Sequence, residues 1–273
     1  INHEVSQAIA ENRRIVILSD RNVSADRVPV SSLLACGGVH HHLIRNKARN
    51  RIALVVDSGE AREVHHLCTL LGYGADAICP WLAQETVMKV GREGLAKSGL
   101  GPDELTANWR HAVDGGILKV MSKMGISIIS SYRGGCNFEA VGLSRALVAE
   151  HFPGMVSRIS GIGLAGIQKK VLEQHAIAYS EDIIALPIGG FYKYRRNGER
   201  HAWEAGLIHM LQQAVATDSY PTFKKYTEAT NKRAPIQLRD LLDFRSTREA
   251  IPLDDVESIT SLRKRFITPG MSL

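Results

Sequence analysis

Three short apolar runs decide the fold of this chain: residues 15–18 read IVIL, residues 52–56 read IALVV and residues 75–79 read ADAIC. The segments between them, at 29–46 and 60–71, carry apolar residues at helical spacing. Short strands that alternate with helices in this way are typical of βαβ units and a parallel sheet. The sequence therefore predicts an α/β fold organised around these runs.

Polar residues directly follow the first two runs. The carboxyl ends of parallel strands are where α/β proteins place their ligands. We therefore take these strand ends and the loops after them as the candidate functional residues: Ser19, Asp20, Arg21, Ser24, Asp26, Arg27, Asp57, Ser58, Glu60 and Arg62. Within this set, Asp26 with Arg27 and Glu60 with Arg62 are also expected as ion pairs that hold the loops.

The turn at residues 57–60 leads from the second run into a predicted helix. Ser58 is suited to capping that helix, and Glu60 is suited to the positive end of its dipole. The same geometry can bind a phosphate on backbone N–H groups, but Glu60 would repel an anion. The third run ends in Pro80-Trp81, which removes an N–H donor and fills the space with an indole. Capping is the preferred interpretation, and a flavin or phosphate site is the alternative.

Composition indicates an ordinary soluble globular protein, with 273 residues, 44% hydrophobic and 23% charged. No apolar stretch approaches the roughly 20 residues that a membrane span needs. The net charge of +6 is modest and its basic residues form short clusters, so neither a membrane nor a nucleic acid is expected as a partner. The four cysteines are scattered singly, which indicates a reducing, cytoplasmic compartment and argues against a zinc site.

Further elements are predicted outside the central runs. Helical patterns are present at residues 3–12, 82–124 (interrupted near 98–102), 138–152 (with a break near 142), 163–175, 203–216, 220–231, 236–244 and 254–266, and one more strand is predicted at 126–131. The glycines of Asp114-Gly115-Gly116 suggest a break or close packing. Residues 189–199 predict a small β-hairpin with an Asn-Gly turn. The aromatic and arginine side chains of that arm, at 192–196, leave RNA binding as a third and weaker interpretation.

A set of motifs resembles the central domain of the glutamate synthase large subunit. They are residues 17–21 (ILSDR), 24–29 (SADRVP), 38–43 (GVHHHL), 57–66 (DSGEAREVHH), 72–75 (GYGA), 119–127 (KVMSKMGIS), 138–143 (FEAVGL), 157–159 (SRI), 161–164 (GIGL) and 223–226 (FKKY). Residues 265–272 (RFITPGMS) resemble the beginning of the flavin domain in that family. The resemblance covers nearly the whole chain in order. It implies that residues 1–252 are the central domain without its N-terminal part, and that residues 253–273 are a linker and the start of the FMN-binding domain. Because the chain begins at Ile1 without a methionine, we expect it to be a fragment.

The resemblance also implies a fold and a role. The expected fold is a parallel (β/α) barrel-like domain, related to the TIM barrel but incomplete, with extra helices and a small β-hairpin. Enzymes of this family hydrolyse glutamine, pass the ammonia through a tunnel and add it to 2-oxoglutarate, using FMN and an iron–sulfur cluster. Their central domain joins the amidotransferase and FMN domains and helps to form the tunnel. The candidate residues are accordingly expected on loops that face other domains or the tunnel.

No catalytic, cofactor-binding or metal residue of the family is carried over to this chain. We expect no cofactor in the fragment, which alone is expected to be inactive. The implied partners are the amidotransferase, FMN and C-terminal helical-barrel domains of the same large subunit, with a small electron-donating subunit. NADPH, NADH and ferredoxin remain open as electron donors. The chain departs from the usual family pattern at Cys36-Gly37, at Arg133 and at Gly135-Cys136-Asn137, so tunnel-lining residues are not assigned. The alternative function is a free-standing, small flavin- or phosphate-binding (β/α) protein that uses the turn at residues 57–62.

Overall fold

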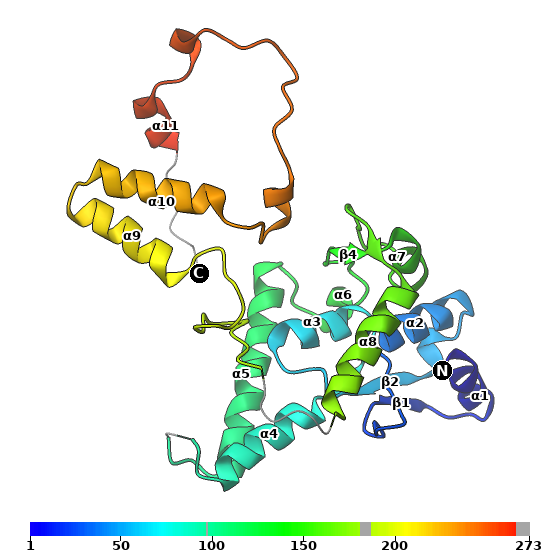
Figure 1. Ribbon diagram of the computed structural model, residues 1–273. Helices are drawn as coiled ribbons and strands as arrows, with labels where there is room; N and C mark the ends of the chain where they lie inside the picture. Colours follow the sequence, from blue (N-terminus) through cyan, green and yellow to red (C-terminus); the bar gives the residue numbers. More distant parts are fainter. Residues whose placement is uncertain (97, 181–186, 266–273) are drawn as a thin grey trace. The chain divides into compact units, whose positions relative to one another are not determined.

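The computed structural model describes residues 1–96, 98–180 and 187–265 (Figure 1). The chain divides into two compact units, Ile1–Ile183 and Ile184–Leu273. The three central strands fall in the first unit, which therefore carries all the candidate functional residues.

A three-stranded parallel sheet forms the centre of the first unit. Its strands are β1 (Ile15–Ser19), β2 (Ala53–Asp57) and β3 (Ala77–Cys79), in the order β1-β2-β3. The register pairs Ser19 with Asp57 and Asp57 with Cys79, so that the three carboxyl ends meet at one edge. The α/β class and the three parallel strands are confirmed.

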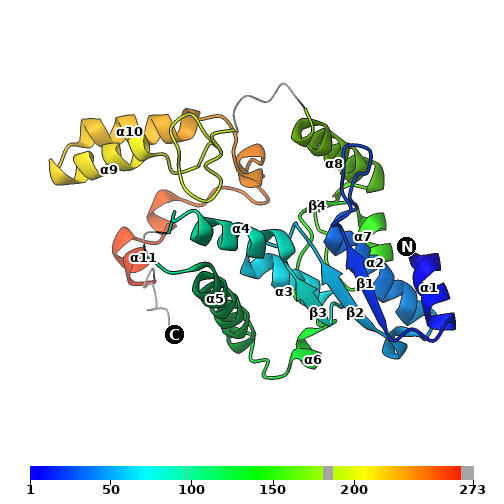
Figure 2. The ribbon, with the colours of Figure 1, turned by 90° about the horizontal axis from the view of Figure 1, so that it is seen from below.

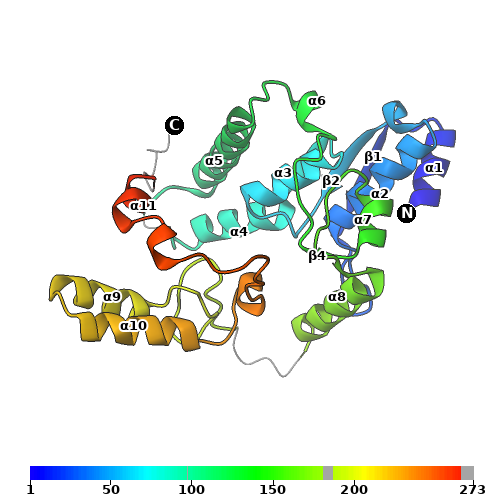
Figure 3. The ribbon, with the colours of Figure 1, turned by 90° about the horizontal axis from the view of Figure 1, so that it is seen from above.

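Helices α1 (Asn2–Ala10), α2 (Ser32–Arg45) and α3 (Val64–Gly72) share one core with the sheet, and a short 3-10 helix, η1 (Arg49–Arg51), precedes β2. That core contains Val5 and Ile9 of α1, Cys36, Val39 and Leu43 of α2, Leu54 and Val56 of β2, and Leu70 of α3. Figures 1 and 3 show α1 beside α2. On the other face of β1, Ile15 and Ile17 remain 63% and 61% exposed. The described helices thus cover one face of β1 and leave these two side chains of the other face in solvent.

Helices α4 (Trp81–Arg92) and α5 (Pro102–Lys123) follow β3 and pack against each other, with the predicted interruption between them (Figure 2). The predicted break at residues 114–116 is wrong, because α5 continues through it. A Cβ at Gly116 would instead clash with the side chain of Val64 on α3. The close packing that the two glycines suggested is therefore confirmed at Gly116.

The strand predicted at residues 126–131 is wrong. Residues 126–128 have no regular structure, and a short helix, α6 (Ile129–Tyr132), follows. Tyr132 is buried and packs with Cys68 of α3 and Met121 of α5. A β-branched run forms a strand where a sheet has a place for it, whereas here the burial of Tyr132 between helices decides the local structure.

The helical region predicted at residues 138–152 has its predicted break near Gly142, but only the part after the break forms a helix. A two-residue strand, β4 (Gly142–Leu143), pairs in parallel with β5 (Gly161–Ile162), and α7 (Arg145–His151) follows β4. The backbone N–H of Ala140 bonds to Val156 O and that of Ser144 to Ile162 O. These long-range bonds draw the first half away from a helix. Helix α8 (Leu164–Ala178) confirms the helix predicted at 163–175.

Within residues 1–96, 98–180 and 187–265, the sheets have three and two strands and do not close into a barrel. The barrel-like part of the predicted fold is therefore not confirmed. In the same residues, no helix is both long enough and apolar enough to cross a membrane.

The second unit contains the helices α9 (Ala205–Ala216) and α10 (Tyr220–Lys232), which lie side by side in Figures 1 to 3. The helix predicted at 236–244 is reduced to a 3-10 turn, η2 (Leu238–Leu241). A second turn, η3 (Leu253–Asp255), and α11 (Ile259–Arg265) stand where one helix was predicted at 254–266. Residue 266 and the rest of the motif at 265–272 lie outside the described residues.

The β-hairpin predicted at residues 189–199 is wrong, although a turn forms at residues 195–198. Asn197 has a φ of 62°, and the N–H of Gly198 bonds to Arg195 O. The described residues of this arm form no β-ladder. Gly189 and Gly190 have φ angles of 68° and 97°, which strand residues do not adopt. A two-stranded hairpin is also marginally stable by itself.

Candidate functional site

The carboxyl edge of the β1–β3 sheet is held by a network centred on Asp57. Asp57 Oδ2 accepts hydrogen bonds of 2.8 Å from Ser19 Oγ and from Arg21 Nε. The guanidinium of Arg21 lies 5.0 Å from the ring centroid of Trp81 and 3.9 Å from Cys79 Sγ. One arginine thereby connects the ends of all three strands.

Asp20 forms a second link across the same edge. Its carboxylate accepts the backbone N–H of Gly59 at 2.8 Å (Oδ2) and the indole N–H of Trp81 at 2.7 Å (Oδ1). A Cβ at Gly59 would lie 3.1 Å from the Trp81 ring. The missing side chain of Gly59 therefore makes room for the indole that Asp20 holds.

The turn after β2 uses its own polar groups. Ser58 is fully buried, its N–H bonds to Cys79 O, and its Oγ lies 2.7 Å from Ser32 Oγ and accepts the N–H of Glu60. Glu60 Oε2 accepts the N–H of Ser32, in the first turn of α2, at 2.7 Å. Helix α3 begins at Val64. The expectation that Ser58 and Glu60 cap the following helix is therefore wrong, because Glu60 reaches back to the start of α2.

These contacts use the N–H groups that a phosphate would need. The N–H groups of Ser58, Gly59 and Glu60 go to Cys79 O, to Asp20 and to Ser58 Oγ, respectively. The positive end of α2 is neutralised by the Glu60 carboxylate. A phosphate at this turn would have to displace both carboxylates, which disfavours the alternative of a phosphate or flavin site.

The electrostatics of the edge follow from these contacts. Partial burial raises the pKa of Asp57, but hydrogen bonds from Ser19, Arg21 and Cys79 lower it by more than burial raises it. The pKa of Asp57 therefore lies below its ordinary value. The bond to Asp57 raises the pKa of Arg21. Burial and then the neighbouring Asp57 raise the pKa of the Cys79 thiol. Cys79 is thus a protonated thiol at neutral pH and a poor nucleophile.

The remaining candidate residues form no hydrogen bond or ion pair with this network in the described structure. Ser24 and Arg27 exchange backbone hydrogen bonds in a tight turn, and His175 of α8 bonds to Ser24 O at 2.7 Å. The described structure has no ion pair between Asp26 and Arg27 or between Glu60 and Arg62, so this expectation is wrong. The backbone N–H of Arg62 bonds to His66 Nδ1, and Glu60 is occupied at α2. The structure therefore joins Ser19, Asp20, Arg21, Asp57, Ser58 and Glu60 in one network, and Ser24, Asp26, Arg27 and Arg62 are not part of it, although Arg27 lines the same groove as Ser19 and Asp20.

A second charged cluster, at the opposite edge of the sheet, was not found by sequence reasoning. Asp76 accepts Arg49 Nη2 and the N–H of Leu54 at 2.7 and 2.8 Å, and it also pairs with Arg133. Arg49 Nε donates to Nδ1 of the buried His40 at 2.9 Å. Burial raises the pKa of Asp76, but its hydrogen bonds with Leu54 and Arg49 lower it by more than burial raises it. The pKa of Asp76 therefore lies below its ordinary value. The one signal was Arg133, a departure from the family pattern.

The three consecutive histidines of α2 point in different directions, because successive residues of a helix are about 100° apart around its axis. His40 bonds to Arg49, His41 to Gly37 O, and His42 to Ser6 Oγ. Across the described part of the chain, no three histidine, cysteine or acidic side chains are placed to hold a metal ion.

Two sequence profiles match this chain. The profile of the glutamate synthase central domain matches residues 1–144, and that of a conserved region in glutamate synthase matches residues 201–273. The NADPH glutamate synthase large chain of Azospirillum brasilense is 57% identical over 273 residues, which are 100% of this chain and 18% of the relative. The NADH glutamate synthase of Schizosaccharomyces pombe is 42% identical over 275 residues, with 98% of this chain and 13% of the relative covered. The chain thus spans less than a fifth of the length of these relatives.

A solved structure of a flavocytochrome b2 variant with sulfite bound aligns with 57% of this chain and 39% of its own length, at 17% identity. Its TM-score of 0.37 is too low to establish a shared fold.

Proposed function

This chain belongs to the glutamate synthase central-domain family, and we propose that it connects the glutamine amidotransferase and FMN domains of a glutamate synthase large chain and helps to form the ammonia tunnel between them. The whole enzyme, an oxidoreductase, would transfer the amide nitrogen of glutamine to 2-oxoglutarate in the cytoplasm. FMN and an iron–sulfur cluster would be held by other parts of the large chain, and a small subunit would supply electrons. The role of this domain is positional, and it contributes no catalytic side chain.

The observation that carries this proposal is the hydrogen-bond network that occupies the backbone N–H groups at the carboxyl edge of the sheet. In a ligand-binding α/β domain, that edge offers free N–H groups and side chains to a ligand. Here the N–H groups of Gly59 and Glu60 are bonded to Asp20 and Ser58, and Arg21 bridges to Asp57. A rigid edge of this kind suits a wall or a domain contact better than a reaction centre.

The fold supports the same proposal. Helices cover one face of the sheet, while Ile15 and Ile17 on the other face are 63% and 61% exposed. Parallel sheets are normally covered on both faces. We therefore propose that this sheet is one arc of an incomplete (β/α) barrel, with Ile15 and Ile17 on its inner face, and that the rest of the large chain covers that face.

The length comparison agrees with a connecting role. The A. brasilense large chain matches this whole sequence with only 18% of its own length. A domain that joins two catalytic domains has neighbours on both sides in the polypeptide. Its surface residues then affect how the two reactions are coupled, without changing either reaction centre.

The test is a coupling measurement on the full-length large chain, assembled with its electron donor. Glutamine hydrolysed and glutamate formed from 2-oxoglutarate are measured together in the wild type, in Arg21→Met and in the matched control Arg92→Met on the exposed end of α4. We expect free ammonia to appear in Arg21→Met and not in the control, while glutamine hydrolysis itself is retained. Tight coupling in Arg21→Met would contradict the placement of this edge near the tunnel.

Two assays on the 273-residue chain alone complete the test. It should form no glutamate from glutamine and 2-oxoglutarate, and turnover by the isolated chain would overturn the positional role. Titration with FMN should give no saturating binding. Stoichiometric uptake of FMN that is lost in Gly59→Phe would replace the proposal with a flavin-binding function.

A further inference from the structure

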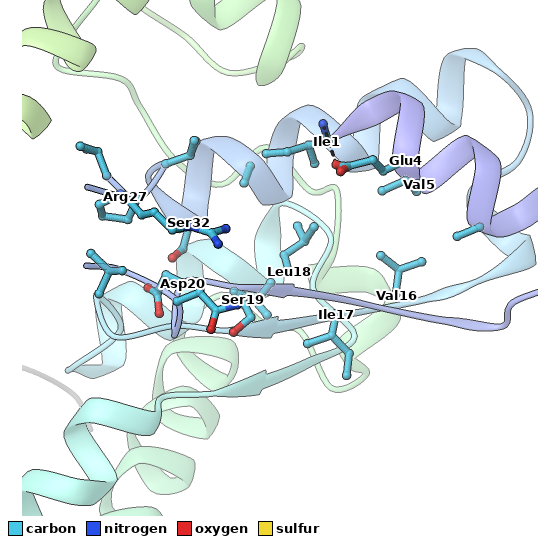
Figure 4. Close-up of a pocket in the computed structure, with 18 of the residues that line it drawn as sticks. Ile1, Glu4, Val5, Val16, Ile17, Leu18, Ser19, Asp20, Arg27 and Ser32 are labelled. Carbon is cyan, nitrogen blue, oxygen red and sulfur yellow. Dashed lines mark ion pairs between the residues drawn. The ribbon is translucent and has the colours of Figure 1, made fainter. Parts of the chain in front are cut away.

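The free edge of β1 borders a groove of about 510 Å³ (Figure 4). Its walls are α1 on one side, the loop at residues 22–30 on the other, and β1 along the floor. Ile1, Glu4 and Val5 line one end, and Arg27 lies at the other end (Figure 4). The groove therefore runs alongside β1, from Ile15 to Asp20.

The hydrogen bonds of β1 leave one edge unused. The N–H of Ala53 bonds to Arg14 O, and that of Asp20 bonds to Asp57 O. In a parallel ladder, every second residue of a strand forms its backbone hydrogen bonds with the same neighbouring strand. These two bonds and the register therefore show that the N–H and C=O groups of Val16 and Leu18 bond to β2. The N–H and C=O groups of Ile15, Ile17 and Ser19 consequently point to the other edge, where the described residues place no strand.

The position of helix α1 indicates that another strand lies beside the free edge of β1. α2 precedes β2 and α3 precedes β3, and α1 precedes β1 in the same way. Val5 and Ile9 of α1 enter the same core as α2, so the two helices cover the same face of the sheet. A crossover helix packs over the two parallel strands that it connects. Since β2 occupies one side of β1, a strand connected through α1 lies on the other.

We propose that the groove binds a parallel β-strand from another part of the same large chain, which pairs with Ile15, Ile17 and Ser19. The relatives supply the length for it, because 82% of the A. brasilense large chain lies outside the match (100% − 18%). The strand brings apolar side chains, since the groove is lined by Val16, Leu18, Val23 and Val28. The inference rests on the proposed function only in taking the strand from the same large chain.

The test compares hydrogen exchange of single β1 amides in the 273-residue chain and in the full-length large chain. In the shorter chain, the amides of Ile15, Ile17 and Ser19 should exchange at least about 100-fold faster than those of Val16 and Leu18. In the large chain, all five should be similarly slow. Fast exchange at Ile15, Ile17 and Ser19 in the large chain overturns the inference. Protection of these amides in the shorter chain that increases with protein concentration also overturns it, because a second copy would then be the occupant.

Two proline variants form a matched pair. Ile17→Pro removes an N–H that points into the groove, whereas Leu18→Pro removes one that bonds to β2. In the 273-residue chain, Ile17→Pro should retain protection of β2, and Leu18→Pro should lose it. In the large chain, Ile17→Pro should restore fast exchange at Ile15 and Ser19, and continued protection there would contradict the proposal.

The wild-type comparison decides the matter if either variant fails to fold. Glutamate formation, assayed on the same preparation of the large chain, separates the two proposals. If the large chain forms glutamate without releasing free ammonia but the amide of Ile17 exchanges fast, the proposal of a paired strand is wrong and the proposed function is unaffected.

Discussion

The indole N–H of Trp81 donates a 2.7 Å hydrogen bond to Asp20 Oδ1, across 61 positions of sequence. The bond joins the loop after β1 to the first residue of α4. Because the same carboxylate also accepts the N–H of Gly59, Asp20 links the segments that follow all three strands. The edge of the sheet is therefore fixed by a side chain as well as by its ladder.

Removal of this carboxylate should destabilise the first unit. Asp20→Ala leaves the indole N–H and the Gly59 N–H without their acceptor, and hydrogen bonds to a charged group contribute about 1.5–3 kcal/mol. We expect the free energy of unfolding to fall by about 2–3 kcal/mol in urea titrations followed by circular dichroism. Asp26→Ala, which removes an exposed carboxylate from the nearby loop, is the control and should stay within about 0.5 kcal/mol of the wild type. Equal effects of the two substitutions would show that Asp20 does not hold the edge.

Two adjacent glycines of α5 should respond to alanine with opposite signs. A Cβ at Gly115 has open space around it, while a Cβ at Gly116 meets the side chain of Val64. Gly115→Ala should raise the free energy of unfolding by about 0.5–1 kcal/mol, because alanine favours a helix interior. Gly116→Ala should lower it by about 1–3 kcal/mol through overpacking. Thermal unfolding of the two variants side by side measures this, and stabilisation by both would refute the close contact with α3.

The three central strands could be predicted because their signal is local. Each apolar run ends in a turn, and a helix connects each run to the following one. In the structure, the register of the sheet places Ser19 beside Asp57 and Asp57 beside Cys79. Residues 126–131 carry a similar run, but the sheet has no place for them and Tyr132 is buried between helices. Local pattern finds a strand only where the rest of the fold supplies its neighbour.

The contacts of the candidate site were less predictable for the same reason. Glu60 was expected to serve the helix that follows it, yet it bonds to Ser32, which is 28 positions earlier. The cluster of Arg49, Asp76 and Arg133 joins residues up to 84 positions apart (133 − 49) and has no motif. Such pairs are fixed by how the sheet and helices pack, which the spacing of charges in the sequence does not specify.

Stability should depend on pH through His40. This histidine is 8% exposed, and burial together with the positive charges of His41 and Arg49 lowers its pKa to about 4. Its ordinary value is 6.5, so between about pH 4 and 6.5 the unfolded chain binds a proton that the folded chain does not. The contribution of neutral His40 to the free energy of unfolding is therefore complete above pH 6.5. It is lost as the pH falls from 6.5 to about 4, by up to about 1.4 kcal/mol per pH unit.

The variant His40→Asn isolates this contribution, because the amide oxygen can still accept the hydrogen bond from Arg49. Urea titrations at pH 7, 6 and 5 should show a shallower loss of stability in His40→Asn than in the wild type. His3→Asn, on the exposed face of α1, is the control and should keep the wild-type slope. An unchanged slope in His40→Asn would mean that His40 gains its proton without unfolding.

The carboxylate of Glu60 should stabilise α2 from outside the helix. Glu60 Oε2 lies 2.7 Å from the N–H of Ser32, where a helix has unpaired donors and a partial positive charge. Glu60→Ala should lower the free energy of unfolding by about 1 kcal/mol, as the loss of an N-terminal cap does. Glu60→Gln keeps an acceptor but not the charge, so its effect should be smaller than that of Glu60→Ala and should shrink at high salt, which screens the charge that the variant removes. Glu85→Gln is the matched control at the same edge, because its exposed ion pair with Arg21 spans 3.5 Å and should contribute less than about 1 kcal/mol. The measurement is urea unfolding at low and high salt, and an effect of Glu60→Ala no larger than that of Glu85→Gln would show that α2 does not depend on this carboxylate.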